Sequence, residues 1–61
     1  MYKVFSLAPM FIPYGVYQTY EEAFAVVKRV DDFLMVIDEC DEDGSIIDKY
    51  QFKKPFFKNI L

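Results

Sequence analysis

Residues 33–52 read FLMVIDECDEDGSIIDKYQF and contain two apolar segments separated by an acidic turn. The first segment, Phe33–Ile37, is continuously apolar and too short for a helix, which is typical of a strand buried on both faces. The dipeptide Asp43-Gly44 favours a two-residue type I′ hairpin turn. We therefore predict that Ile46–Phe52 returns as an antiparallel partner strand.

The predicted turn implies a particular register for this hairpin. The pairs are Ile37 with Tyr50, Met35 with Phe52, Asp38 with Lys49, and Cys40 with Ile47. A three-residue loop would instead set Asp38 opposite Asp48. Opposed like charges destabilise a strand pair, so the two-residue register is favoured.

The pattern Thr19-Tyr20-Glu21-Glu22 predicts the start of a helix. It is a capping box, in which the Thr19 hydroxyl accepts the Glu22 amide and the Glu22 carboxylate accepts the Thr19 amide. Apolar residues then follow at spacings of three and four, which is the period of a helix with one buried stripe. We predict a helix over Tyr20–Val30, ended by two aspartates.

The segment before the helix is predicted to hold a first strand over Tyr2–Leu7, rich in aromatic and β-branched residues. Pro9–Pro13 is predicted to be a loop, because proline has no N–H for a central strand. A short extended piece near Val16 leads into the helix. The whole is a single α+β domain of β-α-β-β order, with a three- or four-stranded, mainly antiparallel sheet and one helix packed on one face.

We predict that the domain spans residues 1–54. The remaining residues, 55–61, are predicted to form an aromatic and basic C-terminal tail. One helix covers only one face of the sheet, although the strand at Phe33–Ile37 is apolar on both. The second face needs cover from the tail or from a second copy of the chain, so we expect a homo-oligomer. This agrees with the tendency of chains near 60 residues that lack disulfides or metals to associate.

Composition excludes several classes of protein. The chain has 61 residues, a net charge of −3, one cysteine and no histidine. The charge opposes general binding to nucleic-acid phosphates, the lone Cys40 allows no internal disulfide, and no apolar run has the ~18 residues of a membrane span. We expect a cytoplasmic protein without cofactors. An enzyme is disfavoured because positioned catalytic groups and a water-excluding pocket are lacking.

Two local patterns in the acidic turn suggest chemistry, and each has a simpler explanation. Glu39–Ile46 has the alternating carboxylates of a calcium loop, but the twelfth position counted from Glu39 is Tyr50, where an EF-hand needs glutamate. Cys40 has no histidine to activate it, and nearby carboxylates oppose thiolate formation. We therefore predict a solvated acidic turn, with no metal site and no nucleophile.

Charge is distributed unevenly along the chain. Residues 31–48 include eight acidic side chains and neither Lys nor Arg, whereas residues 49–61 include four lysines and no acid. Such asymmetry can steer a partner, although a solvated face is the commoner explanation. An acidic mimic of nucleic acid is a third alternative.

Twelve aromatic residues are more ring surface than so short a chain can bury. Phe11 and Tyr14 fall in or beside the proline-bracketed loop, where neither helix nor sheet pairing is expected to hold them inward. Protein interfaces concentrate their energy in such aromatic anchors. The residues predicted to bind a partner are Phe11, Tyr14, Asp41, Glu42, Phe56 and Phe57.

The stretch Gly15-Val16-Tyr17-Gln18-Thr19-Tyr20-Glu21-Glu22-Ala23, followed by the hairpin to Phe52, resembles a pattern of small uncharacterised phage and bacterial proteins. In these proteins a similar helix entry precedes a strand–turn–strand. The resemblance covers residues 15–52 and implies a βαββ fold and a phage setting, where small acidic proteins bind and redirect a host protein in the host cytoplasm. It implies no catalytic or ligand residues.

Taken together, these patterns predict a non-enzymatic protein-binding module that inhibits or redirects a larger host protein as a homodimer. The alternative is an accessory or structural subunit of a larger assembly.

Overall fold

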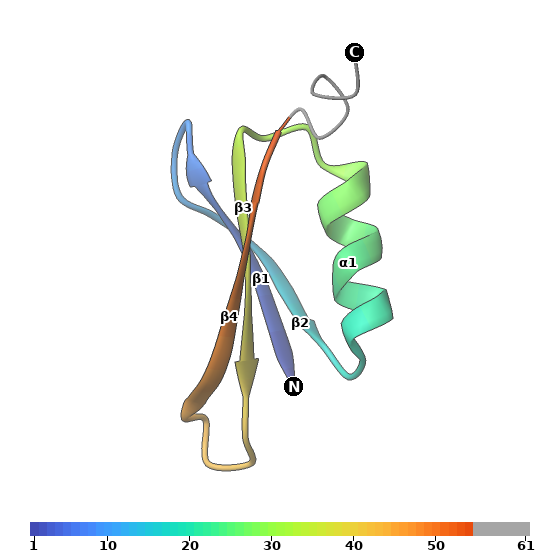
Figure 1. The fold of residues 1–61 in the computed structure, drawn as a ribbon, viewed down its shortest axis with the longest axis vertical. Coiled ribbons are helices and arrows are strands. Elements are labelled where there is room, and N and C mark those ends of the chain that lie inside the picture. The colour runs from blue at the N-terminus through green and yellow to red at the C-terminus, as the bar shows by residue number, and fades with distance from the viewer. Residues whose placement is uncertain (55–61) are drawn as a thin grey trace.

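A computed structural model describes residues 1–54 and shows a four-stranded antiparallel sheet with one helix. The elements are β1 (Tyr2–Ala8), β2 (Ile12–Tyr17), α1 (Tyr20–Arg29), β3 (Leu34–Cys40) and β4 (Ile46–Lys53). The strand order is β2-β1-β3-β4, and α1 stands on one side of the sheet (Figure 1). The predicted α+β fold is confirmed, and the extended piece near Val16 is the fourth strand, β2.

The capping box forms as predicted at the start of α1. Thr19 is extended, its hydroxyl accepts the Glu22 amide at 3.2 Å, and Glu22 Oε1 accepts the Thr19 amide at 3.2 Å. Satisfying two otherwise unpaired N–H groups stabilises this end of the helix. The helix stops at Arg29, one residue before the predicted end, because Val30 has turned to an extended conformation.

Lys54 caps the other end of α1, a contact that the sequence did not indicate. Its ammonium donates to the carbonyl oxygens of Val27 and Val30, which have no partner within the last turn of the helix. A cation is also favoured at the negative end of the helix dipole. Lys54 follows β4 directly, so this contact ties the end of β4 to the end of α1.

The core lies between α1 and the sheet. Its buried side chains are Val4 from β1, Met35 and Ile37 from β3, and Ala23, Val26 and Val27 from α1. Full burial of an aliphatic side chain of this size contributes roughly 1.5–3 kcal/mol. So few buried residues make a small core, and half-buried rings enlarge it at its margin.

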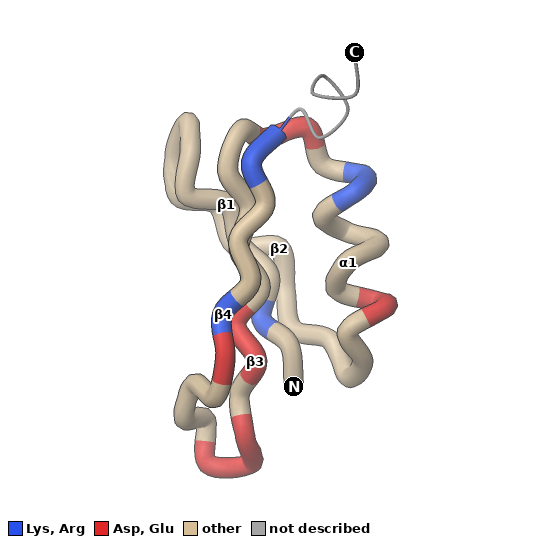
Figure 2. Tube along the Cα trace, in the orientation of Figure 1, with Lys and Arg blue, Asp and Glu red and all other residues tan. Residues whose placement is uncertain are grey.

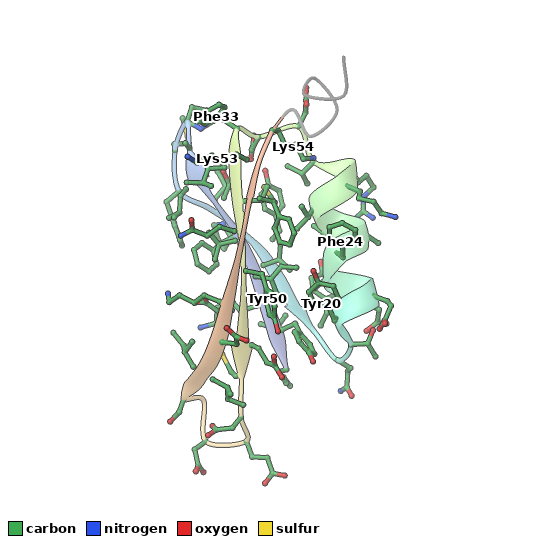
Figure 3. All side chains as sticks on the ribbon, in the orientation of Figure 1. Tyr20, Phe24, Phe33, Tyr50, Lys53 and Lys54 are labelled. Atoms are coloured by element: carbon green, nitrogen blue, oxygen red, sulfur yellow. The ribbon has the colours of Figure 1, made fainter. Side chains whose placement is uncertain are left out.

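Four rings join α1 to β4, which lies beyond the helix at the edge of the sheet. Tyr20 meets Tyr50 with ring centres 5.2 Å apart, and Phe24 meets Phe52 at 5.4 Å. Figure 3 shows Tyr20 and Phe24 reaching from α1 toward β4. Aromatic pairs at these distances attract beyond their buried area, and they fill the space that the helix backbone leaves over β4.

The prediction of a loop through Pro13 is wrong, because β2 already begins at Ile12. Proline is tolerated there since β2 is an edge strand and its outer side needs no N–H donor. A bulge accompanies it: Val4 pairs with Gly15 and Phe5 with Pro13, so Tyr14 is an extra residue on β2.

β3 extends three residues beyond the apolar segment that ends at Ile37, as far as Cys40, where the predicted hairpin pairs also end. The chain start holds this extension, because the Met1 ammonium donates to the Cys40 carbonyl at 2.9 Å and the Cys40 amide donates to the Met1 carbonyl at 2.8 Å. These two residues are 39 positions apart in sequence, and no local sequence pattern predicts their pairing.

The turn between β3 and β4 differs from the type I′ prediction, which requires positive φ at both Asp43 and Gly44. Only Gly44 has a positive φ, of 87°. The Gly44 amide donates to the Asp41 carbonyl at 3.0 Å, and the Asp41 amide donates to the Ser45 carbonyl at 2.9 Å. The loop therefore has three residues and matches a type I turn followed by a left-handed glycine.

The predicted register nevertheless holds over most of the hairpin, because a bulge compensates for the longer loop. Ile37 lies opposite Tyr50, Met35 opposite Phe52, and Asp38 opposite Lys49. Cys40, however, pairs with Ile46 and not with Ile47 as predicted. Ile47 is the extra residue, and it cancels the shift that would have opposed Asp38 to Asp48.

No helix among residues 1–54 is long and apolar enough to cross a membrane.

We expect Gly44→Val to destabilise the fold by about 1–2 kcal/mol, because a side chain with a branched Cβ resists the left-handed backbone. A Cβ at this position meets no atom within 4 Å, so the loss reflects backbone strain alone. Gly44→Asn is the matched control, since asparagine tolerates this region better. Thermal melting compares the two; equal melting temperatures would show that the turn does not constrain stability.

Candidate functional site

The face of the sheet opposite α1 is not covered by any described helix or strand (Figure 1). Side chains alternate between the two faces of a strand, and paired residues share a face. Because Val4, Met35 and Ile37 face the helix, their neighbours face away from it. We call this surface the open face; its residues are Lys3, Phe5, Ala8, Pro13, Val16, Leu34, Val36, Asp38, Cys40, Ile46, Lys49, Gln51 and Lys53.

A second, smaller apolar cluster lies on the open face. Val36 is 2% exposed although no helix covers it, and its cross-strand neighbours are Phe5 and Gln51. The Phe5 ring in turn meets Phe11 with ring centres 5.6 Å apart. Phe5 and Phe11 therefore cover part of the second face with their own side chains.

Phe11 remains 63% exposed beside this cluster. It precedes β2, in the connection that follows β1, and its ring contact with Phe5 places it at the margin of the open face. Val16 on β2 and Leu7 on β1 are also exposed. An apolar patch that is rimmed by polar side chains is typical of a binding surface.

A row of charges crosses the open face next to the apolar cluster. Asp38, on the central strand β3, lies between Lys3 on β1 and Lys49 on β4. Asp38 is 5% exposed, and its Oδ1 lies 3.6 Å from the Lys49 ammonium. That oxygen accepts no hydrogen bond within the described residues, so Lys49 is the group that compensates its charge.

Asp41 and Glu42 stand at the tip of the β3–β4 hairpin, both exposed. Figure 2 shows the acidic residues of this turn gathered at one end of the molecule, with lysines at the opposite end of β4. The Asp41 carboxylate accepts the amides of Asp43 at 3.0 Å and Ser45 at 2.9 Å. Asp41 therefore shapes the turn, whereas Glu42 extends into solvent. The pattern Asp-x-Asp-Gly was a local signal for this role.

A hollow of about 410 Å³ lies where the tip meets the open face. Its walls include Lys3 and Val16 from the open face and Asp41 and Glu42 from the tip. Cys40 also lines it, half-buried, with its thiol 3.8 Å from the Asp38 carbonyl. No group of three or more potential metal ligands occurs within residues 1–54.

Tyr14 is not held outward as predicted. It lies in β2, packs against the core on the helix side, and donates its hydroxyl hydrogen to Asp32 at 2.6 Å. This hydrogen bond, followed by burial, raises the pKa of Tyr14. Of the predicted binding residues, Phe11 borders the open face, and Asp41 and Glu42 form the tip. Tyr14 lies on the other side of the sheet, next to the helix. Phe56 and Phe57 lie outside the described residues.

Glu39 lies opposite Asp48 on the helix side of the hairpin, and tyrosine hydroxyls compensate this pair of like charges. Tyr50 donates to Glu39 Oε1 at 3.1 Å and Tyr2 donates to Oε2 at 3.4 Å. The bond to Glu39, then burial and the charge of Asp48, raise the pKa of Tyr50 to about 12. Burial, followed by Glu39, also raises the pKa of Tyr2.

Comparison with family models, with curated proteins and with solved structures found no match to this chain.

We expect Lys49→Met to destabilise the protein by about 1 kcal/mol, because it leaves the buried Asp38 carboxylate unpaired. The effect is smaller than for a fully buried pair, since the Lys49 side chain is 58% exposed and water screens its charge. The double variant Asp38→Val with Lys49→Met should recover most of this loss. Urea denaturation measures both; a double variant less stable than Lys49→Met would contradict this account of the pair.

We expect stability to fall as the pH rises from about 10 to about 12. Tyr50 in the unfolded chain loses its proton at the ordinary pKa of 10.0, whereas the folded protein holds it until about 12. The stabilisation that comes from the raised pKa of Tyr50 is thus complete below pH 10 and is lost between about pH 10 and about pH 12. Tyr50→Phe should flatten the decline, measured as urea midpoints at pH 9 and pH 11. An unchanged slope would show that the bond to Glu39 does not set this dependence.

Proposed function

We propose that this chain is a non-enzymatic protein-binding module whose contact surface is the open face. The observation that carries the proposal is the exposed Phe11 ring beside Phe5 and Val36, bordered by Lys3 and Lys49. An aromatic anchor within a partly formed apolar cluster, with a charged rim, is the arrangement on which protein interfaces rely.

The activity we propose is to inhibit or redirect the bound protein in the cytoplasm, by occupying one of its surfaces. A chain of 61 residues can act in this way because an interface needs only a rigid face, and the sheet supplies one. The acidic tip beside the open face supports the proposal, since charge of one sign at the margin of an interface speeds encounter with a partner of opposite charge.

We also propose that two copies associate through the open face when no partner occupies it. The exposed Phe11 and Val16 side chains provide apolar surface that a second copy would remove from water. Sedimentation at micromolar concentration tests this part separately, and a monomer across that range would contradict it without bearing on a different partner.

We expect Phe11→Ala to weaken capture of the partner by at least ~1 kcal/mol, or about fivefold, while the fold stays intact. The partner is captured from an extract of cells that express the protein, and the bound amount is titrated against the immobilised chain. Circular dichroism and the melting temperature verify folding.

Met10→Ala is the matched control, because Met10 is 62% exposed, as Phe11 is 63% exposed, and precedes it directly. It makes no ring contact with Phe5, so its loss should leave capture unchanged. If Phe11→Ala captures the partner as well as the parent does, the open face is not the contact surface.

A further inference from the structure

The two edges of the sheet differ in how readily they accept another strand. Within residues 1–54, β2 pairs only with β1 and β4 pairs only with β3. β2 is interrupted by Pro13, which lacks an N–H, by the bulge at Tyr14, and by Gly15 with a φ of 114°. β4 is eight residues long and contains neither proline nor glycine. A long regular edge is the template onto which an incoming strand pairs.

The backbone groups that β4 presents outward follow from the bonds of β3. Cys40 exchanges both of its backbone hydrogen bonds with Met1, on the β1 side. Backbone groups alternate in direction along a strand, so Ile37 and the residues two away from it bond toward β4. Their partners in β4, including Tyr50, are thereby used. The N–H and C=O groups of Gln51 and Lys53 and the C=O group of Lys49 point away from the sheet, whereas the Lys49 N–H donates to the Asp48 carboxylate at 2.8 Å.

The side chains along this edge specify the chemistry of an incoming strand. On the open-face side they are Lys49, Gln51 and Lys53, two cations without a carboxylate. On the helix side are the Tyr50 and Phe52 rings, which pack against the core. Opposite charges and aromatic–aliphatic contacts stabilise directly opposed residues. An incoming strand fits if carboxylates lie opposite the lysines and apolar side chains lie opposite the rings.

A second copy of β4 lacks this complementarity. The acidic residue of β4 is Asp48, whose side chain is on the helix side together with Tyr50, whereas the lysines are on the open face. When two copies of the same edge pair antiparallel about a two-fold axis, residues that lie opposite one another project from the same face of the sheet. Asp48 can therefore never lie opposite Lys49 or Lys53 of the second copy.

We propose that β4 binds an extended segment of a partner protein by strand addition, and that this segment has carboxylates at its first and fifth positions and apolar residues at its second and fourth. The backbone ladder supplies affinity and the alternating side chains supply selectivity. The proposal goes beyond the use of the open face, because it concerns the edge of the sheet and does not need Phe11.

The test uses the full 61-residue chain, labelled with ¹⁵N, and a cyclised hairpin peptide whose free strand reads Glu-Val-Thr-Val-Glu. We expect this peptide to shift the amide signals of Lys49, Gln51 and Lys53 and to slow hydrogen exchange at Gln51 and Lys53, with no change along β2. A peptide with Lys in place of both Glu should bind about tenfold more weakly at low salt, because two attractive pairs become repulsive.

Lys53→Glu should remove the preference for the Glu peptide, because each peptide then makes one attractive and one repulsive pair with the edge. Arg29→Glu, an equal change in charge on α1, should keep the preference. Phe11→Ala should bind the Glu peptide as the parent does, which separates this edge from the open face. Equal binding of both peptides to the parent chain, shifts along β2 or at Phe5 and Phe11, or no binding at all would overturn the proposal; in the last case the lysines only protect the edge from aggregation. A dimer whose β4 amides are already protected would overturn it in favour of a second copy.

Discussion

Burial of Val4, Met35 and Ile37 beneath α1 constrains everything else in this small domain. A helix of ten residues is about 15 Å long, and it packs against β1, β2 and β3 on one side of the sheet. It cannot also cover β4 or the opposite face. The aromatic pairs between α1 and β4, the open face and the exposed edge all follow from this single limit.

The open face shows how the chain partly compensates for missing cover. Val36 is enclosed by its cross-strand neighbours, and Asp38 is held next to Lys49. These arrangements stabilise the monomer, yet they leave Phe11 exposed beside an apolar cluster. The surfaces proposed to bind partners are thus an apolar face and a backbone edge that no described helix or strand covers. They differ in chemistry, so variants can separate them.

The strand irregularities adapt local preferences to the sheet. The bulge at Ile47 lets a three-residue loop coexist with the pairing of Asp38 and Lys49. The bulge at Tyr14 accompanies Pro13 on the edge strand β2 and gives Tyr14 a place on the helix side, where it reaches Asp32. At both bulges the cross-strand pairing of side chains is kept, because one extra residue in the strand takes up the shift in register.

The sequence by itself determined the helix start at Thr19, the strand segments, the central register of the hairpin, and the exposure of Phe11, Asp41 and Glu42. Each depends on residues close in the chain, through capping bonds, alternation or pairing across one turn. Only the tertiary structure decided the strand order, the inward Tyr14, the pairing of Met1 with Cys40, and the meeting of Phe5 with Val36 on the open face. These join segments far apart in sequence, and packing against a common core, which has no local signal, selects among their pairings.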